Sequence, residues 1–143
     1  MFDISVLLEK FNFIEYIDGK IILKQNLPEV LEYLKNNPEF DFNMLTSIVA
    51  IDWNDTIELI YQLYSVSNNE TIQIYYYTTT SIVPSVINIF KSAYFDECEI
   101  YDMFGVYFEH NQNLKRLFMP ESWIGHPLLK SYKQSDERLA WND

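Results

Sequence analysis

The chain has 143 residues, of which 48% are hydrophobic and 17% aromatic, and it carries a net charge of −11. This composition excludes a disordered chain and suits one domain with one core. The charge excludes a nucleic-acid partner, since phosphate binding needs clustered Lys and Arg. The sequence has no secretory signal pattern and no direct membrane span, and its single Cys98 cannot form an internal disulfide. We therefore expect a cytoplasmic protein.

The first 40 residues predict two helices and one strand. Apolar residues recur every three or four positions from Val6 to Ile14, which predicts an amphipathic helix over residues 5–13 that Asp18 and Gly19 end. Residues 20–23 predict a short strand. Pro28 suits the first turn of a second helix, which stops before Pro38. The residues that this helix should bury are Val30, Leu31 and Leu34.

The middle of the chain predicts a sheet. Residues 45–51, 56–66 and 71–78 are rich in β-branched and aromatic side chains, and turn-forming residues separate them. This pattern is typical of an antiparallel meander. In its middle strand the residues expected to face the core are Ile57, Leu59, Tyr61 and Leu63. The fold class predicted is therefore α+β, with an antiparallel sheet meander packed against helices in two layers.

After the sheet, Pro84 predicts the start of a helix that buries Val86, Ile89 and Phe90. A second helical segment should run from about Tyr94 to Gly105, a suitable C-cap residue. Within it, a spacing of three places Asp96, Glu99 and Asp102 on one side. Such carboxylates form either a solvated or interface-facing stripe, which we favour, or an acid/base pair. Cys98, His110 and His126 are of ligand type, but their wide spacing argues against a metal site, and Cys98 should be buried in the helix.

The last quarter of the chain differs from the rest. Residues 1–110 hold five Lys and 17 acidic residues, whereas residues 111–143 hold five basic and four acidic ones, including both Arg. From Phe118 onward neither helix nor strand periodicity continues. We predict a globular domain over residues 1–117 and an extended C-terminal arm over 118–143. Either the domain's own core or a partner must cover the apolar residues of this arm, which are Trp123, Ile124, Leu128, Tyr132 and Trp141.

Several short motifs occur in an order typical of one family. They are residues 97–105 (ECEIYDMFG), 113–117 (NLKRL), 119–128 (MPESWIGHPL), Lys130, Tyr132 and 138–142 (RLAWN). With the preceding strands and residues 83–85 (VPS), they resemble the C subunit of bacterial NADH-quinone oxidoreductase. This is the 30-kilodalton subunit family of respiratory complex I.

The resemblance implies a cofactor-free structural subunit in the peripheral arm of a proton-translocating respiratory-chain complex. The chain would support the hydrogenase-like large subunit (D type) at the quinone site, alongside other peripheral-arm subunits. Iron–sulfur clusters, FMN and quinone would belong to those partners. The protein would lie at the cytoplasmic face of the cell inner membrane, as a peripheral part of the complex that transports electrons from NADH to quinone.

The resemblance also implies which residues form the partner interface. These are Glu97, Glu99, Asp102, Arg116, Trp123, Gly125, Pro127, Leu128, Lys130 and Tyr132. Uncharged Cys98, Leu129 and Ser131 stand where the family has charged residues. We therefore expect the arm to hold its partner more by Trp123, Leu128 and Tyr132 than by ion pairs.

These departures keep two alternatives open. One is an equivalent small subunit of a membrane-bound NiFe hydrogenase or another complex I-related oxidoreductase. The other is a free-standing acidic binding module or small enzyme that uses Asp96, Glu99 and Asp102 with His110.

Overall fold

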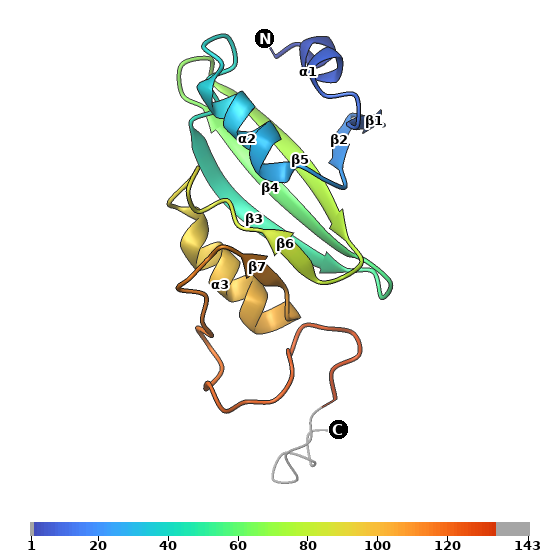
Figure 1. Ribbon diagram of the computed structural model, residues 1–143, viewed down its shortest axis with the longest axis vertical. Helices are drawn as coiled ribbons and strands as arrows, with labels where there is room; N and C mark the ends of the chain where they lie inside the picture. The colour runs from blue at the N-terminus through green and yellow to red at the C-terminus, as the bar shows by residue number, and fades with distance from the viewer. Residues whose placement is uncertain (1, 134–143) are drawn as a thin grey trace.

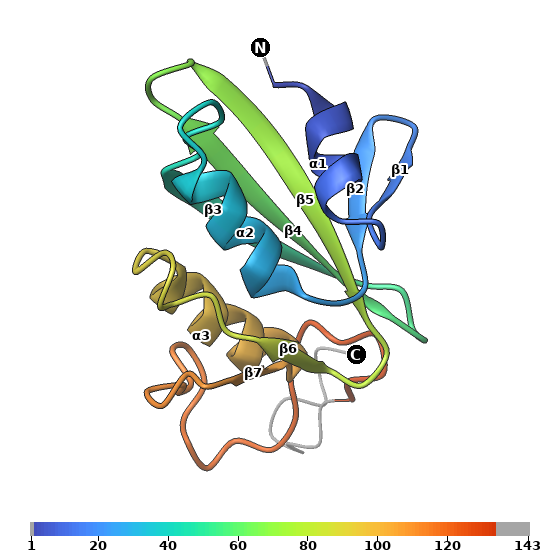
Figure 2. The same cartoon turned by 45° about the horizontal axis from the view of Figure 1, so that its top comes forward.

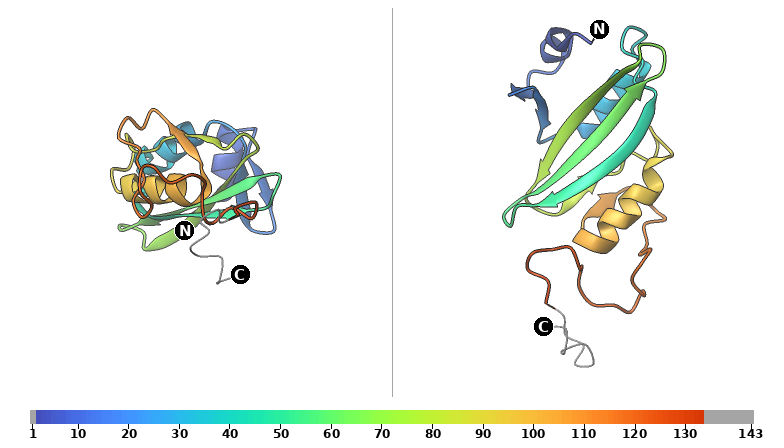
Figure 3. Two further views of the ribbon diagram at one scale, coloured as in Figure 1. Left: turned by 90° about the horizontal axis from the view of Figure 1, so that it is seen from below. Right: turned by 180° about the vertical axis from the view of Figure 1, so that it is seen from behind.

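The computed structural model describes residues 2–133 (Figure 1). A five-stranded sheet in the order β1-β2-β5-β4-β3 carries helices on one face, where α2 and α3 both lie (Figure 2). The opposite face carries no helix among the described residues (Figure 3). Fold class α+β is confirmed. The elements are α1 Ile4–Lys10, β1 Glu15–Ile17, β2 Lys20–Leu23, α2 Leu27–Asn36, β3 Met44–Asp52, β4 Ile57–Ser65, β5 Glu70–Thr78, β6 Ile82–Pro84, α3 Ala93–Phe104 and β7 Tyr107–Glu109.

The predicted meander is confirmed as β3, β4 and β5, which pair antiparallel in sequence order. Tyr61, at the centre of β4, lies between Ile48 of β3 and Ile74 of β5. The four residues predicted to face the core from β4 are all buried. In α2 the three residues predicted to be buried, Val30, Leu31 and Leu34, are fully buried.

The N-terminal segment differs from its prediction. The first helix ends at Lys10. The Phe11 N–H still donates to the Leu7 carbonyl, but Phe11 itself has an extended backbone (φ −124°), and residues 11–13 are not helical. Asp18 and Gly19, at φ +51° and +78°, form a hairpin turn between β1 and β2. β2 then joins β5 in parallel, so the sheet contains one parallel pair besides its antiparallel ones.

The segment after the sheet is also different from its prediction. Pro84 ends strand β6, and residues 85–92 form turns rather than a helix. The Ser85 N–H donates to the Glu109 carbonyl, next to the parallel pairing of β6 with β7, and this pairing holds the chain extended there. Val86 and Phe90 are still buried. The second predicted helix is confirmed as α3, with Gly105 at its C-cap.

Within residues 2–133, the buried residues of the hydrophobic core all lie between Leu7 and Phe108. Arm residues contribute at its margin, where Leu129 packs against it while half-buried. No helix in residues 2–133 has the length and apolar character to cross a membrane.

Candidate functional site

Two fully buried carboxylates on α3 organise the C-terminal part of the molecule. Glu97 accepts hydrogen bonds from Ser85 Oγ at 2.7 Å, the Val86 N–H at 2.9 Å and Asn111 Nδ2 at 2.9 Å. Burial raises the pKa of Glu97, and these three donors partly oppose that rise. Glu97 therefore links the segments that follow β6 and β7 to α3. Its carboxylate oxygens have a structural role.

Asp102, one turn further along α3, binds the start of the arm. Its Oδ2 accepts the backbone N–H groups of Leu117, Phe118 and Met119 at 3.1, 2.7 and 3.1 Å. Its Oδ1 accepts Nη1 of the nearly buried Arg116 at 3.2 Å. Three backbone donors and one guanidinium thus compensate a charge that is 0% exposed.

The arm then crosses the C-terminal end of α3. Arg116 Nη2 donates to the Gly125 carbonyl at 2.7 Å, and His126 Nδ1 lies 2.9 Å from the Asp102 carbonyl oxygen. A Cβ on Gly105 would lie 2.7 Å from the His126 ring. The glycine that caps α3 therefore leaves the space that the His126 ring of the arm occupies.

The arm ends its described course beside the β3–β4 turn. The Leu128 N–H donates to the Met103 carbonyl, and the Lys130 N–H donates to Asp52 Oδ2 at 2.8 Å. Lys130 Nζ lies 5.8 Å from the Trp53 ring centre. The arm is therefore bonded to its own domain both at its start and near Lys130, within its described part.

Trp53 in turn belongs to a polar cluster on the open sheet face. Glu58 is buried and accepts hydrogen bonds from Trp53 Nε1 at 3.1 Å and the Tyr77 hydroxyl at 2.6 Å. Burial and this hydrogen bond raise the pKa of Tyr77 to about 12. The cluster orients the Trp53 ring, over which Lys130 Nζ lies.

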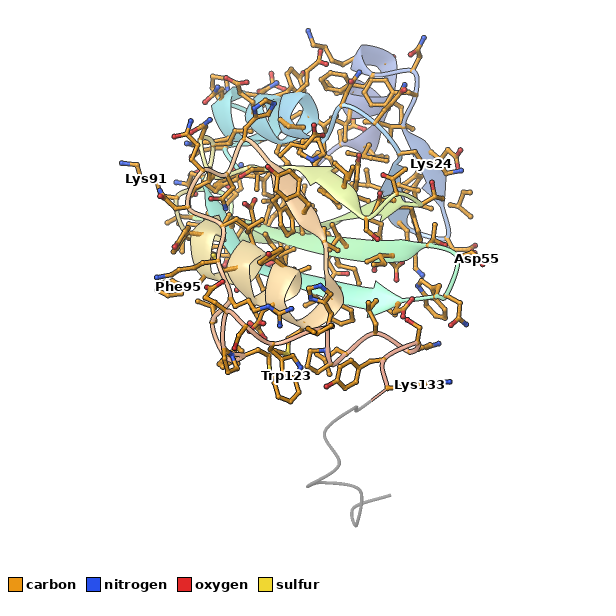
Figure 4. All side chains as sticks on the ribbon, turned by 60° about the horizontal axis from the view of Figure 1, so that its bottom comes forward. Lys24, Asp55, Lys91, Phe95, Trp123 and Lys133 are labelled. Carbon is orange, nitrogen blue, oxygen red and sulfur yellow. The ribbon has the colours of Figure 1, made fainter. Side chains whose placement is uncertain are left out.

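The apolar side chains of the arm divide into two groups. Trp123 Nε1 donates to the Tyr132 hydroxyl at 3.2 Å, and both rings are half-buried. Phe118, Ile124 and Leu128 are 68%, 88% and 54% exposed. Trp123 and Lys133 lie at the end of the molecule opposite α1 (Figure 4). The Trp123 and Tyr132 rings are therefore partly covered, whereas the Phe118, Ile124 and Leu128 side chains are exposed to solvent.

The structure brings together five of the ten residues predicted for the partner interface, in two groups. Asp102, Arg116 and Gly125 share one hydrogen-bond network, and Trp123 and Tyr132 form a pair. Glu97 is buried away from any surface, Pro127 is half-buried, and Glu99 and Lys130 are exposed. Trp141 and Arg138 lie outside the described residues.

The idea of a carboxylate stripe is wrong for Asp96 and Asp102. Each step of three residues turns by about 60° around the helix axis, so Asp96 and Asp102 lie about 120° apart and have different surroundings. Asp96 accepts the Ile48 N–H of the edge strand β3 at 3.0 Å, Asp102 is buried, and Glu99 faces solvent. His110 is exposed, with a φ of +71° that places it in a turn.

The three residues of metal-ligand type have separate environments. Cys98 is buried in α3, as predicted. His126 contacts the end of α3, and His110 lies in the turn after β7. Within residues 2–133 no three His, Cys, Asp or Glu side chains converge as a metal site would require.

Sequence reasoning missed several residues on which the arm depends. Asp52 and Trp53 contact the arm at Lys130, and Ser85 and Asn111 donate to Glu97. No sequence pattern marks Asn111 as a partner of Glu97, because the two meet only through the parallel pairing of β6 with β7. Asp52 could have been noticed as an acidic residue that directly follows a predicted strand.

Comparison with known proteins gives one consistent result. The family described as respiratory-chain NADH dehydrogenase, 30 Kd subunit, matches residues 21–138. The C subunit of the NADH-quinone oxidoreductase of Herpetosiphon aurantiacus is 31% identical over 123 residues, which cover 82% of this chain and 72% of the relative. The combined C/D subunit of the same enzyme in a Sulfurihydrogenibium species is 32% identical over 133 residues, 87% of this chain but 23% of that protein.

Among solved structures, a similar chain occurs in the membrane-bound sulfane sulfur reductase, an archaeal respiratory membrane complex. The TM-score is 0.64 at 25% sequence identity. The match covers 82% of this chain and 76% of that one.

Proposed function

Since this chain belongs to the 30-kilodalton subunit family of the respiratory-chain NADH dehydrogenase, complex I, we propose that it is a cofactor-free structural subunit of the peripheral arm. In this role it supports a hydrogenase-like subunit of the D type at the quinone site. Iron–sulfur clusters, FMN and quinone belong to its partners. The chain itself takes no part in electron transfer from NADH to quinone, and it sits peripherally at the cytoplasmic face of the membrane.

The observation that carries this proposal is how the carboxylates of α3 are used. Glu97 and Asp102 are saturated by donors from the chain itself, and most of these donors are backbone or neutral groups. A carboxylate that must accept these hydrogen bonds to stay buried is unavailable as an acid or base. The hydrogen bonds to Asp102 fix the start of an arm whose Phe118, Ile124 and Leu128 side chains remain exposed, which favours docking over chemistry.

The identity of the partner is supported by a relative. The Sulfurihydrogenibium protein, named as both the C and the D subunit, carries its similarity to this chain in about a quarter of its length. A single chain that combines the two favours a direct contact between them when they are separate.

A second candidate is an equivalent small subunit in a complex I-related oxidoreductase, such as a membrane-bound NiFe hydrogenase. The likeness to a chain of the membrane-bound sulfane sulfur reductase favours it. Both candidates share the role of the arm and differ in the assembly around it. Mass spectrometry of the purified assembly separates them by the presence or absence of NADH-oxidising subunits.

Co-purification tests the role itself. A tagged chain, extracted from native membranes in mild detergent, should bring down an iron–sulfur, hydrogenase-like partner. The triple variant Phe118→Ser, Ile124→Ser, Leu128→Ser should lose at least about tenfold of that yield while its unfolding midpoint stays unchanged, because these side chains are already exposed.

The matched control is Val66→Ser with Ile82→Ser, two apolar residues of similar exposure that lie outside the arm. This control should co-purify like the wild-type chain. Recovery of the wild-type chain as a lone monomer would overturn the proposal. Equal loss in the arm and control variants would show that the arm is not the contact.

A further inference from the structure

Residues 120–132 of the arm form hydrogen bonds to one another as well as to the domain. Three backbone bonds close successive turns, with N–H donors from Trp123, Leu129 and Tyr132 at 2.9, 3.1 and 3.0 Å. The acceptor in each case is the carbonyl three residues earlier, which is the bond of a β-turn. Compact loops that pack on their own side chains often carry a function. We call residues 120–132 the arm loop.

One aromatic pair closes the arm loop. Trp123 Nε1 donates to the Tyr132 hydroxyl at 3.2 Å. The Tyr132 ring also lies against the backbone of Gly125, where an added Cβ would be 3.0 Å from Cε2 of the ring. Gly125 has a φ of +96°, which residues with a side chain rarely adopt. The backbone of Gly125 and the ring of Tyr132 therefore fit together only because residue 125 is glycine.

Ile124 lies between two residues whose positions are fixed. Trp123 is held by its turn and by Tyr132, and the Gly125 carbonyl accepts Nη2 of Arg116 at 2.7 Å. The Ile124 side chain is nevertheless 88% exposed, the largest fraction for a large apolar residue within residues 2–133. An apolar side chain on a fixed backbone gives up little conformational freedom when a partner covers it.

We propose that the arm loop is already folded in the isolated chain and presents Ile124 to an apolar pocket of the partner subunit. Trp123, Gly125 and Tyr132 are positioning residues, which act through the loop rather than by touching the partner. This rests on the proposed role as a subunit of an assembly and refines it, since the sequence suggested Trp123 and Tyr132 as contacts. A binding segment that is folded beforehand binds more tightly, because less entropy is lost on association.

Hydrogen exchange in the isolated chain tests whether the arm loop is folded there. The Leu128 N–H donates to the Met103 carbonyl and the Tyr132 N–H to the Leu129 carbonyl. Both amides should exchange at least about tenfold more slowly than in an unfolded peptide of the same sequence. Exchange at the rate of the peptide, with protection only in the assembly purified from membranes, would show that the loop folds on binding and would overturn the proposal.

Tyr132→Phe tests the positioning role. It removes the acceptor of Trp123 Nε1 and keeps the ring against Gly125. Amide exchange in the arm loop of the isolated chain should become faster, and the yield of co-purified partner should fall about fivefold, while the unfolding midpoint stays unchanged. Tyr64→Phe is the control, because it removes one similar bond, from the Tyr64 hydroxyl to Asn69 Oδ1, outside the arm. A lower yield without faster exchange would make Tyr132 a direct contact and overturn its positioning role.

Gly125→Ala provides a second variant with its own control. An added Cβ at Gly125 meets the Tyr132 ring, whereas at Gly19, with a φ of +78°, it meets nothing within 4 Å. Both variants carry the backbone strain of a positive φ, and only Gly125→Ala also disturbs the loop. Gly125→Ala should lower the yield of partner at least about fivefold, and Gly19→Ala should leave it unchanged. Equal yields for Gly125→Ala and the wild-type chain would contradict the proposal.

Ile124→Ala separates contact from positioning. Because the Ile124 side chain is exposed, its truncation should leave amide exchange in the isolated chain unchanged and lower the yield of partner at least about fivefold. An unchanged yield would overturn the assignment of Ile124 as the contact. If the wild-type chain recovers no partner, the subunit role itself fails. If it recovers the partner and the variants of the arm loop do so equally well, only the loop proposal fails.

Discussion

The Oδ2 atom of Asp102 accepts the backbone N–H of Phe118 at 2.7 Å, which joins the last helix to the first residue of the predicted arm. The residues on either side of Phe118 donate to the same oxygen. One buried carboxylate thus sets the direction in which the arm leaves the domain. The predicted boundary between residues 117 and 118 falls inside this group of hydrogen bonds, and it stays a prediction.

Replacing Asp102 should be among the most destabilising changes in the chain. Asp102→Ala leaves the nearly buried Arg116 and three N–H groups without their acceptor, and loss of one partner of a buried ion pair costs about 3–5 kcal/mol. Urea unfolding followed by tryptophan fluorescence measures the effect. Glu99→Ala, on an exposed position of the same helix, should change the free energy of unfolding by less than about 0.5 kcal/mol. Similar values for both variants would contradict the role of Asp102.

Gly105 should tolerate no side chain for two separate reasons. Its φ of +73° costs a non-glycine residue about 1–2 kcal/mol. A Cβ there also meets the His126 ring at 2.7 Å. Gly105→Ala should therefore destabilise the protein by more than the backbone cost alone. Adding His126→Ala should recover the steric part, so the double variant should be more stable than the sum of the single changes predicts. Strict additivity would show that the ring moves aside freely.

The pH dependence of stability should report on Glu97. Burial raises the pKa of Glu97 in the folded protein, so the folded state binds its proton more readily than the unfolded chain does. This contribution to stability is fully present below the unfolded pKa, about 4.3 for Glu, and is lost as the pH rises through the folded value. The free energy of unfolding of the wild-type chain should therefore fall relative to Glu97→Gln between about pH 4 and pH 7.

Glu99→Gln supplies the control for that comparison, because Glu99 lies on the exposed side of α3. The difference in free energy of unfolding between Glu99→Gln and the wild-type chain should change less with pH than the difference for Glu97→Gln. If the free energies of unfolding of Glu97→Gln and the wild-type chain differed by a constant amount between about pH 4 and pH 7, the raised pKa of Glu97 would be contradicted.

Removal of residues 118–143 should leave a folded but weakened domain that no longer co-purifies with its partner. The fully buried core ends at Phe108, so the sheet and helices keep their packing. Asp102 loses the N–H groups of Phe118 and Met119, each of which we expect to contribute about 1 kcal/mol or more. Circular dichroism and urea unfolding check the fold, and affinity purification checks the partner. An unfolded fragment would place the arm within the folding unit.

Periodicity and turn chemistry in the sequence determined the local elements of this protein. Alternation along residues 57–65 identified β4, and the apolar spacing around Leu31 identified α2. Gly105 marked the end of α3 because only glycine adopts its backbone conformation easily. Short motifs near the C-terminus identified the family, because they lie in contiguous stretches of the chain.

Only the tertiary structure decided what the acidic residues do. Asp96, Glu97 and Asp102 lie on one helix, yet their partners come from β3, the segment after β6, the turn after β7 and the arm, at separations of 11 to 48 residues. The sequence did not predict the parallel pairing of β2 with β5 or of β6 with β7 either. A periodic pattern reports which face of an element is apolar. It carries no information on which distant backbone N–H will meet a given carboxylate, because that depends on how the elements pack.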